Sequence, residues 1–232
     1  MKGKLYLIPV PIHSEEDFNI EYTPPYLIKI VNKIKIFAVE NIRTSRRFLR
    51  KLNPKYDIDH TVFELINKKS DSNDFIKILE YLLNGNNVGV MSESGCPGIA
   101  DPGQKICDIA HQNKISIKPL IGPSSILLAL MASGLNGQKF QFHGYLPINS
   151  SERINALKKL KPYTGSHIFI ETPYRNQKVF DEIINTIKDR NRKLCVAIDI
   201  TGKNEKIFTK KITVLKNEVI VLKKYPTIFI IE

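Results

Sequence analysis

The sequence has little cysteine and no long hydrophobic run, and both shortages exclude classes of protein. The three cysteines, Cys96, Cys107 and Cys195, do not have metal-ligand spacing, and an odd number argues against a disulfide framework. The longest apolar stretch, residues 126–132, is far shorter than the roughly 20 residues of a transmembrane helix. The N-terminal apolar segment lacks the small-residue cleavage site of a signal peptide. We therefore expect a cytoplasmic protein in a reducing setting.

Several motifs with known chemistry are also missing. No Gly-x-Gly-x-x-Gly follows the first predicted strand, which argues against a Rossmann dinucleotide site. The sequence contains no P-loop and no Gly-x-Ser-x-Gly nucleophile elbow. The five histidines are not spaced as metal ligands. We therefore predict no metal site, no P-loop NTPase and no serine hydrolase of the elbow type.

Acidic residues are fewer than basic ones, 23 against 35, which gives a formal net charge of +12. Such an excess predicts a polyanionic partner, most directly a nucleic acid. The alternative is compositional, because the abundant lysine, isoleucine and asparagine are what an AT-rich coding sequence favours. Net charge bears on association and not on the fold.

Apolar runs of strand length alternate with segments of helical period along the whole chain, which predicts an α/β fold. A hydrophobic content of 42% is enough for a packed core. A boundary near Leu120 divides the chain into two α/β domains, 1–119 and 120–232. Ser14 is a candidate helix N-cap. The predicted strands are 5–12, 34–39, 57–65, 87–91, 115–120, 140–146, 167–171, 194–198, 207–213 and 227–231, the last two being candidates for antiparallel pairing. The predicted helices are 40–50, 74–83, 104–113, 126–133, 149–160 and 178–188.

The chain is organised around residues 92–103, a loop between a predicted buried strand and a predicted helix. It contains three glycines and two prolines. Glycine lets a ligand approach the backbone, and proline makes the loop stiff. Twelve residues are also long for a simple strand-to-helix turn. We interpret the segment as a binding loop at the carboxyl end of a parallel strand, where open α/β sheets bind ligands.

Two further segments are candidates for ligand contact. Arg43, Arg46, Arg47 and Arg50 lie within two turns of one predicted helix and are half of the chain's eight arginines. They are either phosphate contacts or an ordinary solvated helix face. Ser124 and Ser125 precede the predicted helix 126–133, where they serve either as N-caps or as ligand contacts.

These motifs resemble those of the tetrapyrrole methylase family of S-adenosylmethionine-dependent methyltransferases. The specific motif is Ser-x-x-Gly-x-Pro-x-Ile-x-Asp-Pro-Gly at 92–103, with Gly-Pro-Ser-Ser at 122–125 and Glu-Thr-Pro-Tyr-Arg at 171–175 in support. The resemblance is greatest to the branch that methylates a cytidine 2′-hydroxyl of small-subunit ribosomal RNA. The matching segments are collinear and comprise residues 5–18, 40–49, 90–103, 121–135, 142–147 and 169–176.

The resemblance implies a two-domain fold with a cofactor cleft between the domains, S-adenosyl-L-methionine as cofactor, a homodimer, and ribosomal RNA or the small ribosomal subunit as partner. The chain departs from the branch at His13 and Ser14, and at Asn41, where an aspartate is usual. The implied catalytic residues are Glu40, Arg43, Glu93 and Glu171, with Asp101 as a further carboxylate. The implied cofactor-binding residues are Pro11, Ser94, Gly95, Cys96, Ile99, Ser124, Ser125, Glu171 and Ala197. The implied substrate-binding residues are Arg43, Arg46 and Arg175.

Two alternatives to an RNA methyltransferase stay open at this point. One is a methyltransferase that acts on a small molecule such as a tetrapyrrole. The other is a basic RNA-binding relative that has kept the fold without catalysis. Cofactor binding separates an enzyme from the second alternative, and a steep salt dependence of RNA binding argues against the first.

Overall fold

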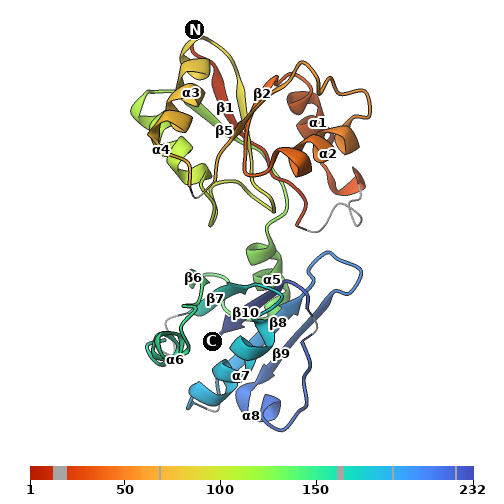
Figure 1. Cartoon of the computed structure of the whole chain (residues 1–232). Coiled ribbons are helices and arrows are strands. Elements are labelled where there is room, and N and C mark those ends of the chain that lie inside the picture. The colour runs from red at the N-terminus through yellow and green to blue at the C-terminus, as the bar shows by residue number, and fades with distance from the viewer. Residues whose placement is uncertain (13–19, 68, 161–164, 190, 223) are drawn as a thin grey trace. The chain divides into compact units, whose positions relative to one another are not determined.

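A computed structural model describes residues 1–12, 20–67, 69–160, 165–189, 191–222 and 224–232. His13, and the expected N-cap at Ser14, lie outside these residues. The chain divides into two compact units, Met1–Ser124 and Ser125–Glu232 (Figure 1). Each unit contains one five-stranded sheet, so the predicted α/β class is confirmed.

The sheet of the first unit is entirely parallel, with the strand order β3-β2-β4-β1-β5. Its strands are β1 (Lys4–Leu7), β2 (Ile36–Val39), β3 (Val62–Leu65), β4 (Val88–Met91) and β5 (Ser116–Pro119). Its helices are α1 (Pro25–Val31), α2 (Ile42–Leu52), α3 (Ser72–Leu83) and α4 (Gly103–Gln112), with a 3₁₀ turn at Ile20–Tyr22. Both faces of such a sheet must be covered, which explains why β2 and β4 are buried at every position.

Alternate side chains of β2 enter two separate cores, one on each face of the first sheet. Phe37 and Val39 pack with α1 and α2, whereas Ile36 and Ala38 pack with α3 and α4. The two helix pairs accordingly lie on opposite faces of the sheet (Figure 1). This three-layer arrangement places every strand-to-helix loop at the carboxyl edge of the sheet.

The second unit contains a mixed sheet with the strand order β6-β7-β10-β8-β9, in which only β6 and β7 are parallel. The strands are β6 (Phe140–Tyr145), β7 (Ser166–Glu171), β8 (Lys193–Ile198), β9 (Lys206–Lys211) and β10 (Thr227–Ile231). The helices are α5 (Ser125–Ser133), α6 (Ser150–Lys158), α7 (Asn176–Thr186) and α8 (Ile212–Leu215). The expected antiparallel pairing of the two late strands with their neighbours is confirmed.

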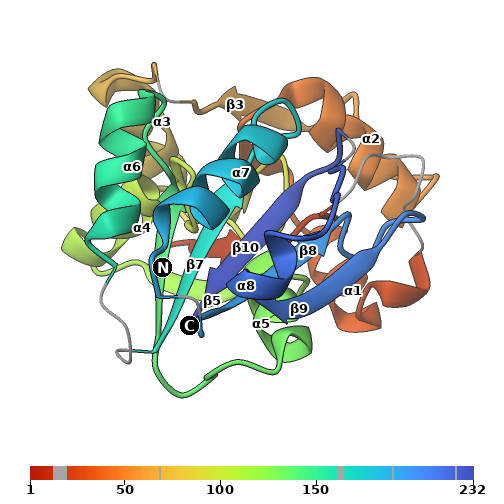
Figure 2. The same ribbon diagram turned by 90° about the horizontal axis from the view of Figure 1, so that it is seen from below.

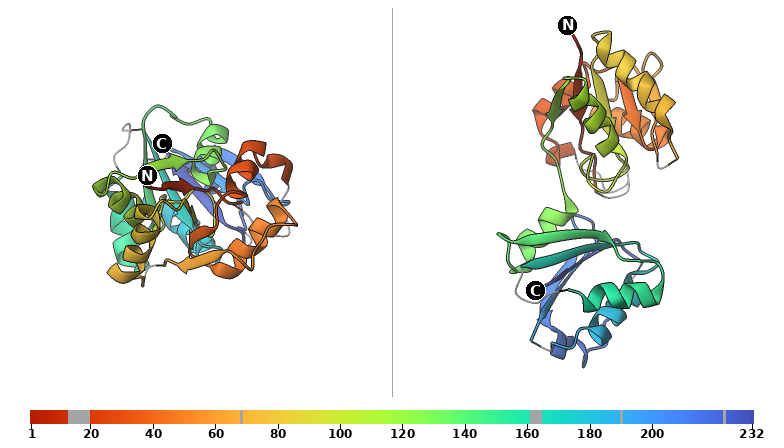
Figure 3. Two further views of the ribbon diagram at one scale, coloured as in Figure 1. Left: turned by 90° about the horizontal axis from the view of Figure 1, so that it is seen from above. Right: turned by 90° about the vertical axis from the view of Figure 1, so that its left-hand side faces the viewer.

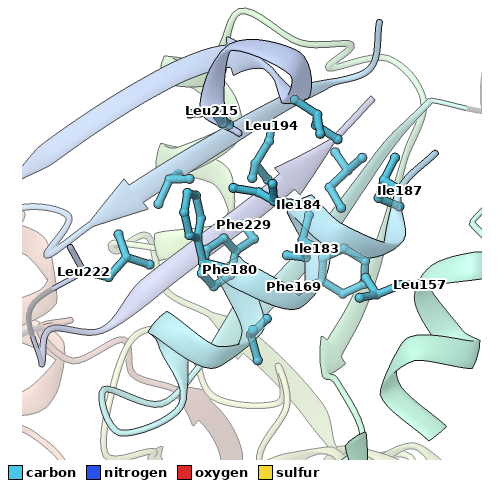
Figure 4. Packing of buried hydrophobic residues seen from close by; sticks show 14 of the residues in the cluster. Leu157, Phe169, Phe180, Ile183, Ile184, Ile187, Leu194, Leu215, Leu222 and Phe229 are labelled. Atoms are coloured by element: carbon cyan, nitrogen blue, oxygen red, sulfur yellow. The ribbon is translucent and has the colours of Figure 1, made fainter. Parts of the chain in front are cut away.

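Helices cover both faces of the second sheet (Figure 3). Helix α5 packs on one face through Ala129 and Leu130. The other face carries α6, α7 and α8. In Figure 2, α7 and α8 lie over the strands of this sheet. Phe169, Phe180 and Phe229 lie at the centre of this second core (Figure 4). The described residues include no helix long and apolar enough to cross a membrane.

Several predicted boundaries were too generous, and two helices were missed. Strand β1 ends at Leu7, because Ile8 makes a single further bond to β4 before the chain turns at two prolines. Strand β3 comprises only the last four residues of the predicted 57–65, since the preceding segment folds into turns closed by Asp57. The α1 segment begins at Pro25, which suits a first helical turn, and α8 is only four residues long.

Candidate functional site

The carboxyl ends of β2 and β4 form a topological switch point in the first sheet. The two strands are neighbours, but the chain leaves β2 toward β3 at one edge and leaves β4 toward β5 at the other. The two departing loops therefore diverge, and ligands of open α/β sheets bind in the crevice at such a point. Residue Glu40 follows β2 directly, and the loop 92–103 follows β4.

Glu40, Asn41 and Glu93 are joined at this switch point. The backbone N–H of Glu93 donates to Glu40 Oε2 at 2.9 Å, and the Asn41 amide donates to Glu93 Oε1 at 3.0 Å. Asn41 Oδ1 also accepts from the backbone N–H groups of Arg43 and Thr44, which makes Asn41 the N-cap of α2. An aspartate at this position would keep the cap but lose the donor to Glu93. Asn41 thus lets two glutamates lie side by side without a third carboxylate.

Asp101 closes the loop 92–103 on itself. Its carboxylate accepts from the backbone N–H of Gly98 at 2.9 Å and of Gly103 at 2.7 Å. Burial raises the pKa of Asp101, and these backbone bonds oppose the rise. With its oxygens engaged in this way, Asp101 is a structural tether, and the switch-point glutamates are the better candidates for chemistry.

The loop 92–103 is fastened to the segments that follow β1 and β5. The backbone N–H of Val10 donates to Gly95 O at 2.9 Å, and Ser94 Oγ donates to Ile12 O at 3.1 Å. Cys96 Sγ lies 3.3 Å from Pro123 O, and burial raises the pKa of the Cys96 thiol. The segments that leave β1, β4 and β5 (the exits of these strands) thus meet around this loop.

Two glycines are required by this arrangement. Gly95 has φ +69°, a left-handed conformation that side chains disfavour, and a Cβ there would have only Pro123 O within 4 Å, at 3.6 Å. A Cβ on Gly122 would lie 2.2 Å from Pro9 Cβ, so this close contact between the two exit loops needs glycine. The backbone at Gly95 is therefore buried and held in place, with room for a Cβ beside Pro123 O.

The expected cofactor residues of the first unit gather at this edge. Pro11 follows Val10 in the β1 exit and is half-buried, whereas Ile99 at the loop tip is 53% exposed. Ser124 ends the β5 exit, and Ser125 is the first residue of α5, at the start of the second unit. The roles of these residues in binding stay predictions. Hydrogen bonds join Ser94, Gly95 and Cys96 to the segments that follow β1 and β5.

The exposed face of helix α2 is basic, because all four of its arginines lie there. Its buried face is formed by Phe48, Leu49 and Leu52. Arg43 lies in the first turn, where the helix dipole disfavours a cation, beside the switch-point glutamates. Further along lies a hollow of about 460 Å³ lined by Arg46, Arg47, Arg50, Lys51 and Ile58. Arg46 is also 3.8 Å from Asp59, an exposed pair that contributes little to stability.

In the second unit, Glu171 and Arg175 form an ion pair at the end of β7. Glu171 is buried, and its Oε1 accepts from the N–H and hydroxyl of Thr172. Its Oε2 lies 3.1 Å from Arg175 Nη2. The same nitrogen donates to the carbonyls of Leu146 and Pro147 at 3.0 and 3.1 Å. Arg175 therefore braces two loops, and its role as a phosphate contact stays a prediction.

Ala197 occupies a core position. It lies on β8, is 1% exposed, and packs in the cluster beneath α5. The side chain is thus surrounded by the apolar residues of its own unit, and its contact with the cofactor stays a prediction.

Sequence reasoning missed the buried ion pair of Arg153 and Glu182. Arg153 is 1% exposed and donates to both Glu182 oxygens and to the carbonyls of Pro147 and Ile148. The partners lie 29 residues apart on α6 and α7, so local spacing carries no signal of the pair. The sequence did contain one hint, an arginine among the apolar positions of a short helix.

Comparison with known proteins gives the family. Residues 4–216 match the family model described as Tetrapyrrole (Corrin/Porphyrin) Methylases. Two curated relatives named "Ribosomal RNA small subunit methyltransferase I" are from Buchnera aphidicola and Thermotoga maritima. The first, from the Acyrthosiphon pisum subspecies, is 30% identical over 92% of this chain and 72% of its own length. The second is 29% identical over 91% of this chain and 89% of its own.

Solved structures with the same fold are more distant in sequence. The methyltransferase CobJ has a TM-score of 0.64 at 13% identity, covering 98% of this chain and 93% of its own. Uroporphyrin-III-C-methyltransferase from Thermus thermophilus has a TM-score of 0.57 at 11% identity, covering 100% of this chain and 92% of its own. At these identities the likeness is one of fold alone. Because the family model spans most of the chain, the chain belongs to the tetrapyrrole (corrin/porphyrin) methylase family.

Proposed function

We propose that this protein methylates a ribose 2′-hydroxyl of small-subunit ribosomal RNA. As a member of its family, the chain is a methyltransferase dependent on S-adenosylmethionine. The observation that carries the RNA substrate is α2, whose arginines begin beside the switch-point glutamates and continue into a cationic hollow. The names of the relatives support the same substrate. We further propose that the protein acts in the cytoplasm, where ribosomal subunits occur.

The loop 92–103 has the properties that a bound S-adenosylmethionine needs. Gly95 is buried in the loop, and a Cβ there would have only Pro123 O within 4 Å outside its chain neighbours, so the space beside its Cα can take part of a ligand. The side chain of Glu93 is exposed at the same edge and accepts from donors such as ribose hydroxyls. When bound, the cofactor supplies an electrophilic methyl group. The part of this chain is to hold donor and acceptor in line, and such positioning is worth roughly 7–11 kcal/mol.

Glu93 is the proposed proton acceptor for the ribose hydroxyl. A hydroxyl attacks a methyl group only as its proton is removed or strongly polarised. Glu40 accepts a backbone N–H at 2.9 Å and orients the loop. Glu93 has one oxygen held by Asn41, while its side chain is exposed. Arg43, beginning the basic face, is proposed to orient a neighbouring phosphate.

A methyl-transfer assay tests this proposal. Purified protein, labelled S-adenosylmethionine and small ribosomal subunits from a strain lacking the protein should give labelled RNA. Digestion to nucleosides should place the label on a 2′-O-methyl ribose. Label on a base, or no label on subunits while a tetrapyrrole is methylated, would overturn the proposed substrate.

Replacing Arg43 or Arg46 with alanine should weaken RNA binding similarly for all sequences. Each lost phosphate contact lowers the slope of log affinity against log salt by roughly 0.7–0.9. Cofactor affinity should stay unchanged, because S-adenosylmethionine has no phosphate. The measurement is RNA binding by anisotropy at several salt concentrations. Lys77→Ala, which removes an exposed cation from α3 on the opposite face of the sheet, is the control. Slopes identical to the wild type in both arginine variants would contradict this role of α2.

We also propose a homodimer. The ground is α5, which is apolar on both sides: Ala129 and Leu130 are buried, whereas Leu127 and Met131 are 51% and 79% exposed. An exposed apolar stripe on a helix that is already packed on its other side is typical of a surface that another chain covers. Light scattering at micromolar concentration should give twice the chain mass of 26.5 kDa, and Met131→Glu should lower it. A monomeric wild-type protein would disprove the dimer.

A further inference from the structure

The end of β6 and the loops that follow β6 and β7 carry three exposed apolar side chains. Tyr145 is 53% exposed, Ile148 is 84% exposed and Tyr174 is 85% exposed. Because β6 and β7 are parallel neighbours, both loops lie at the same edge of the second sheet. Single exposed apolar residues are common, but adjacent ones from two loops are typical of a binding surface.

The backbone beneath these side chains is held firmly. Arg175 Nη2 donates to the carbonyls of Leu146 and Pro147, and the buried Arg153 donates to the carbonyls of Pro147 and Ile148 at 2.7 and 2.8 Å. In the loop that follows β7, the backbone N–H of Arg175 donates to Thr172 O at 3.0 Å, which closes a turn. A fixed backbone lowers the entropy that an exposed side chain loses when it binds a partner.

A cation lies against the Tyr174 ring. Lys224 Nζ is 5.7 Å from the ring centroid. The chain beside it is fixed, because the Asn176 amide donates to Tyr225 O at 2.9 Å. A flat aromatic ring with a cation at its face suits a nucleotide, since the ring stacks on a base while the ammonium contacts a phosphate. Single-stranded RNA offers such bases, whereas duplex RNA keeps its bases stacked inside the helix.

We propose that Tyr174 stacks on an unpaired base of the RNA substrate and that Lys224 contacts the adjoining phosphate. This deepens the proposed function and rests on it: the substrate class is RNA whose target region is single-stranded, as in a loop or an opened helix. Tyr174 is a positioning residue in this account, because it holds the substrate without touching the methyl group. Tyr145, the last residue of the neighbouring strand β6, provides a second ring at the same edge.

The experiment measures the affinity of the full chain for two probes by fluorescence anisotropy at fixed salt. One probe is a mixed-sequence single-stranded oligoribonucleotide and the other is an RNA duplex of equal length. Tyr174→Ala should weaken single-strand binding roughly 5- to 150-fold, the range for loss of one stacked base. Tyr174→Phe, which keeps the ring, should bind within about twofold of the wild type, and duplex binding should change little in both variants. Lys224→Ala should lower the salt slope for the single strand by roughly 0.7.

Phe140→Ala is the matched control, because Phe140 is an exposed aromatic at the opposite end of β6 and should leave both affinities unchanged. S-adenosylmethionine affinity, measured by calorimetry, should be the same in all variants. The stacking proposal is overturned if Tyr174→Ala binds the single strand like the wild type, or weakens the duplex equally. It is also overturned if Tyr174→Ala changes the oligomeric state, because the ring would then contact a second copy. Failure of the proposed function looks different, since wild-type protein would then not methylate ribosomal subunits at all.

Discussion

Replacing Glu182 with alanine is expected to lower the free energy of unfolding by about 3–5 kcal/mol, because it leaves the buried guanidinium of Arg153 without its counter-ion. Arg153 is 1% exposed, and Glu182 accepts from two of its nitrogens and from Ser150 Oγ. The measurement is urea unfolding followed by circular dichroism. The control is Glu218→Ala, since the Lys210–Glu218 pair is also close, at 2.6 Å, but its side chains are 40% and 35% exposed. That change should cost about 1 kcal/mol or less.

The same pair gives a pH dependence with a definite sign. The hydrogen bond from Arg153 holds the pKa of Glu182 below its usual range. The resulting stabilisation is fully present above the ordinary glutamate pKa of about 4.3, and it is lost as the pH falls through the lowered folded-state pKa. The stability difference between wild type and Glu182→Ala should therefore shrink on acidification. An equal difference at pH 7 and at pH 3 would show that the charge of Glu182 is not what stabilises the unit.

The period of apolar residues was enough to predict most elements of both units. Helix α3 shows why: Phe75, Ile78 and Leu82 repeat at helical spacing and are all buried, and Asp71 caps the helix through Asn73 and Asp74. Helix α8, by contrast, has only four residues, too few for a period to appear. Segment 57–61 contains one apolar residue, the buried Ile58, which lies in a turn, and apolar character alone does not separate such a residue from one in a strand.

The candidate site was predictable in part, because loop composition is local whereas side-chain partners are not. The glycines and prolines of 92–103 indicated a stiff, open loop from the sequence alone. The tether that Asp101 provides joins residues two and three positions away, but the same carboxylate looked equally fit for catalysis. The bond between Asn41 and Glu93 spans 52 positions and depends on β2 and β4 being neighbours, which no residue pattern states. The pairing of Asn41 with Glu93 therefore follows from the strand order, which the sequence alone does not indicate.

Replacing Gly95 with leucine is expected to weaken binding of S-adenosylmethionine about 10- to 100-fold, or to abolish it. Gly95 is buried, and a Cβ there would have only Pro123 O, at 3.6 Å, within 4 Å outside its chain neighbours, so a leucine side chain would fill the space beside this backbone that the cofactor is proposed to use. Forcing bulk into an occupied contact costs typically 1–3 kcal/mol, and each 1.4 kcal/mol is tenfold in affinity. The measurement is calorimetric titration with S-adenosylmethionine and with S-adenosylhomocysteine.

The effect on binding must be separated from backbone strain, because Gly95 has φ +69° and any side chain there is disfavoured. Gly134 provides a matched control: its φ is +66°, and a Cβ there meets nothing within 4 Å. Gly134 ends α5, so it lies outside the loop 92–103 and its neighbouring exits. The part of the stability loss that comes from backbone strain should therefore be similar at both positions, since the φ angles are alike. Only the Gly95 variant should lose cofactor affinity. If the folded Gly95→Leu protein bound S-adenosylmethionine as tightly as Gly134→Leu does, the loop 92–103 would not be the cofactor-binding loop, and the switch-point glutamates would have to act on a donor held elsewhere.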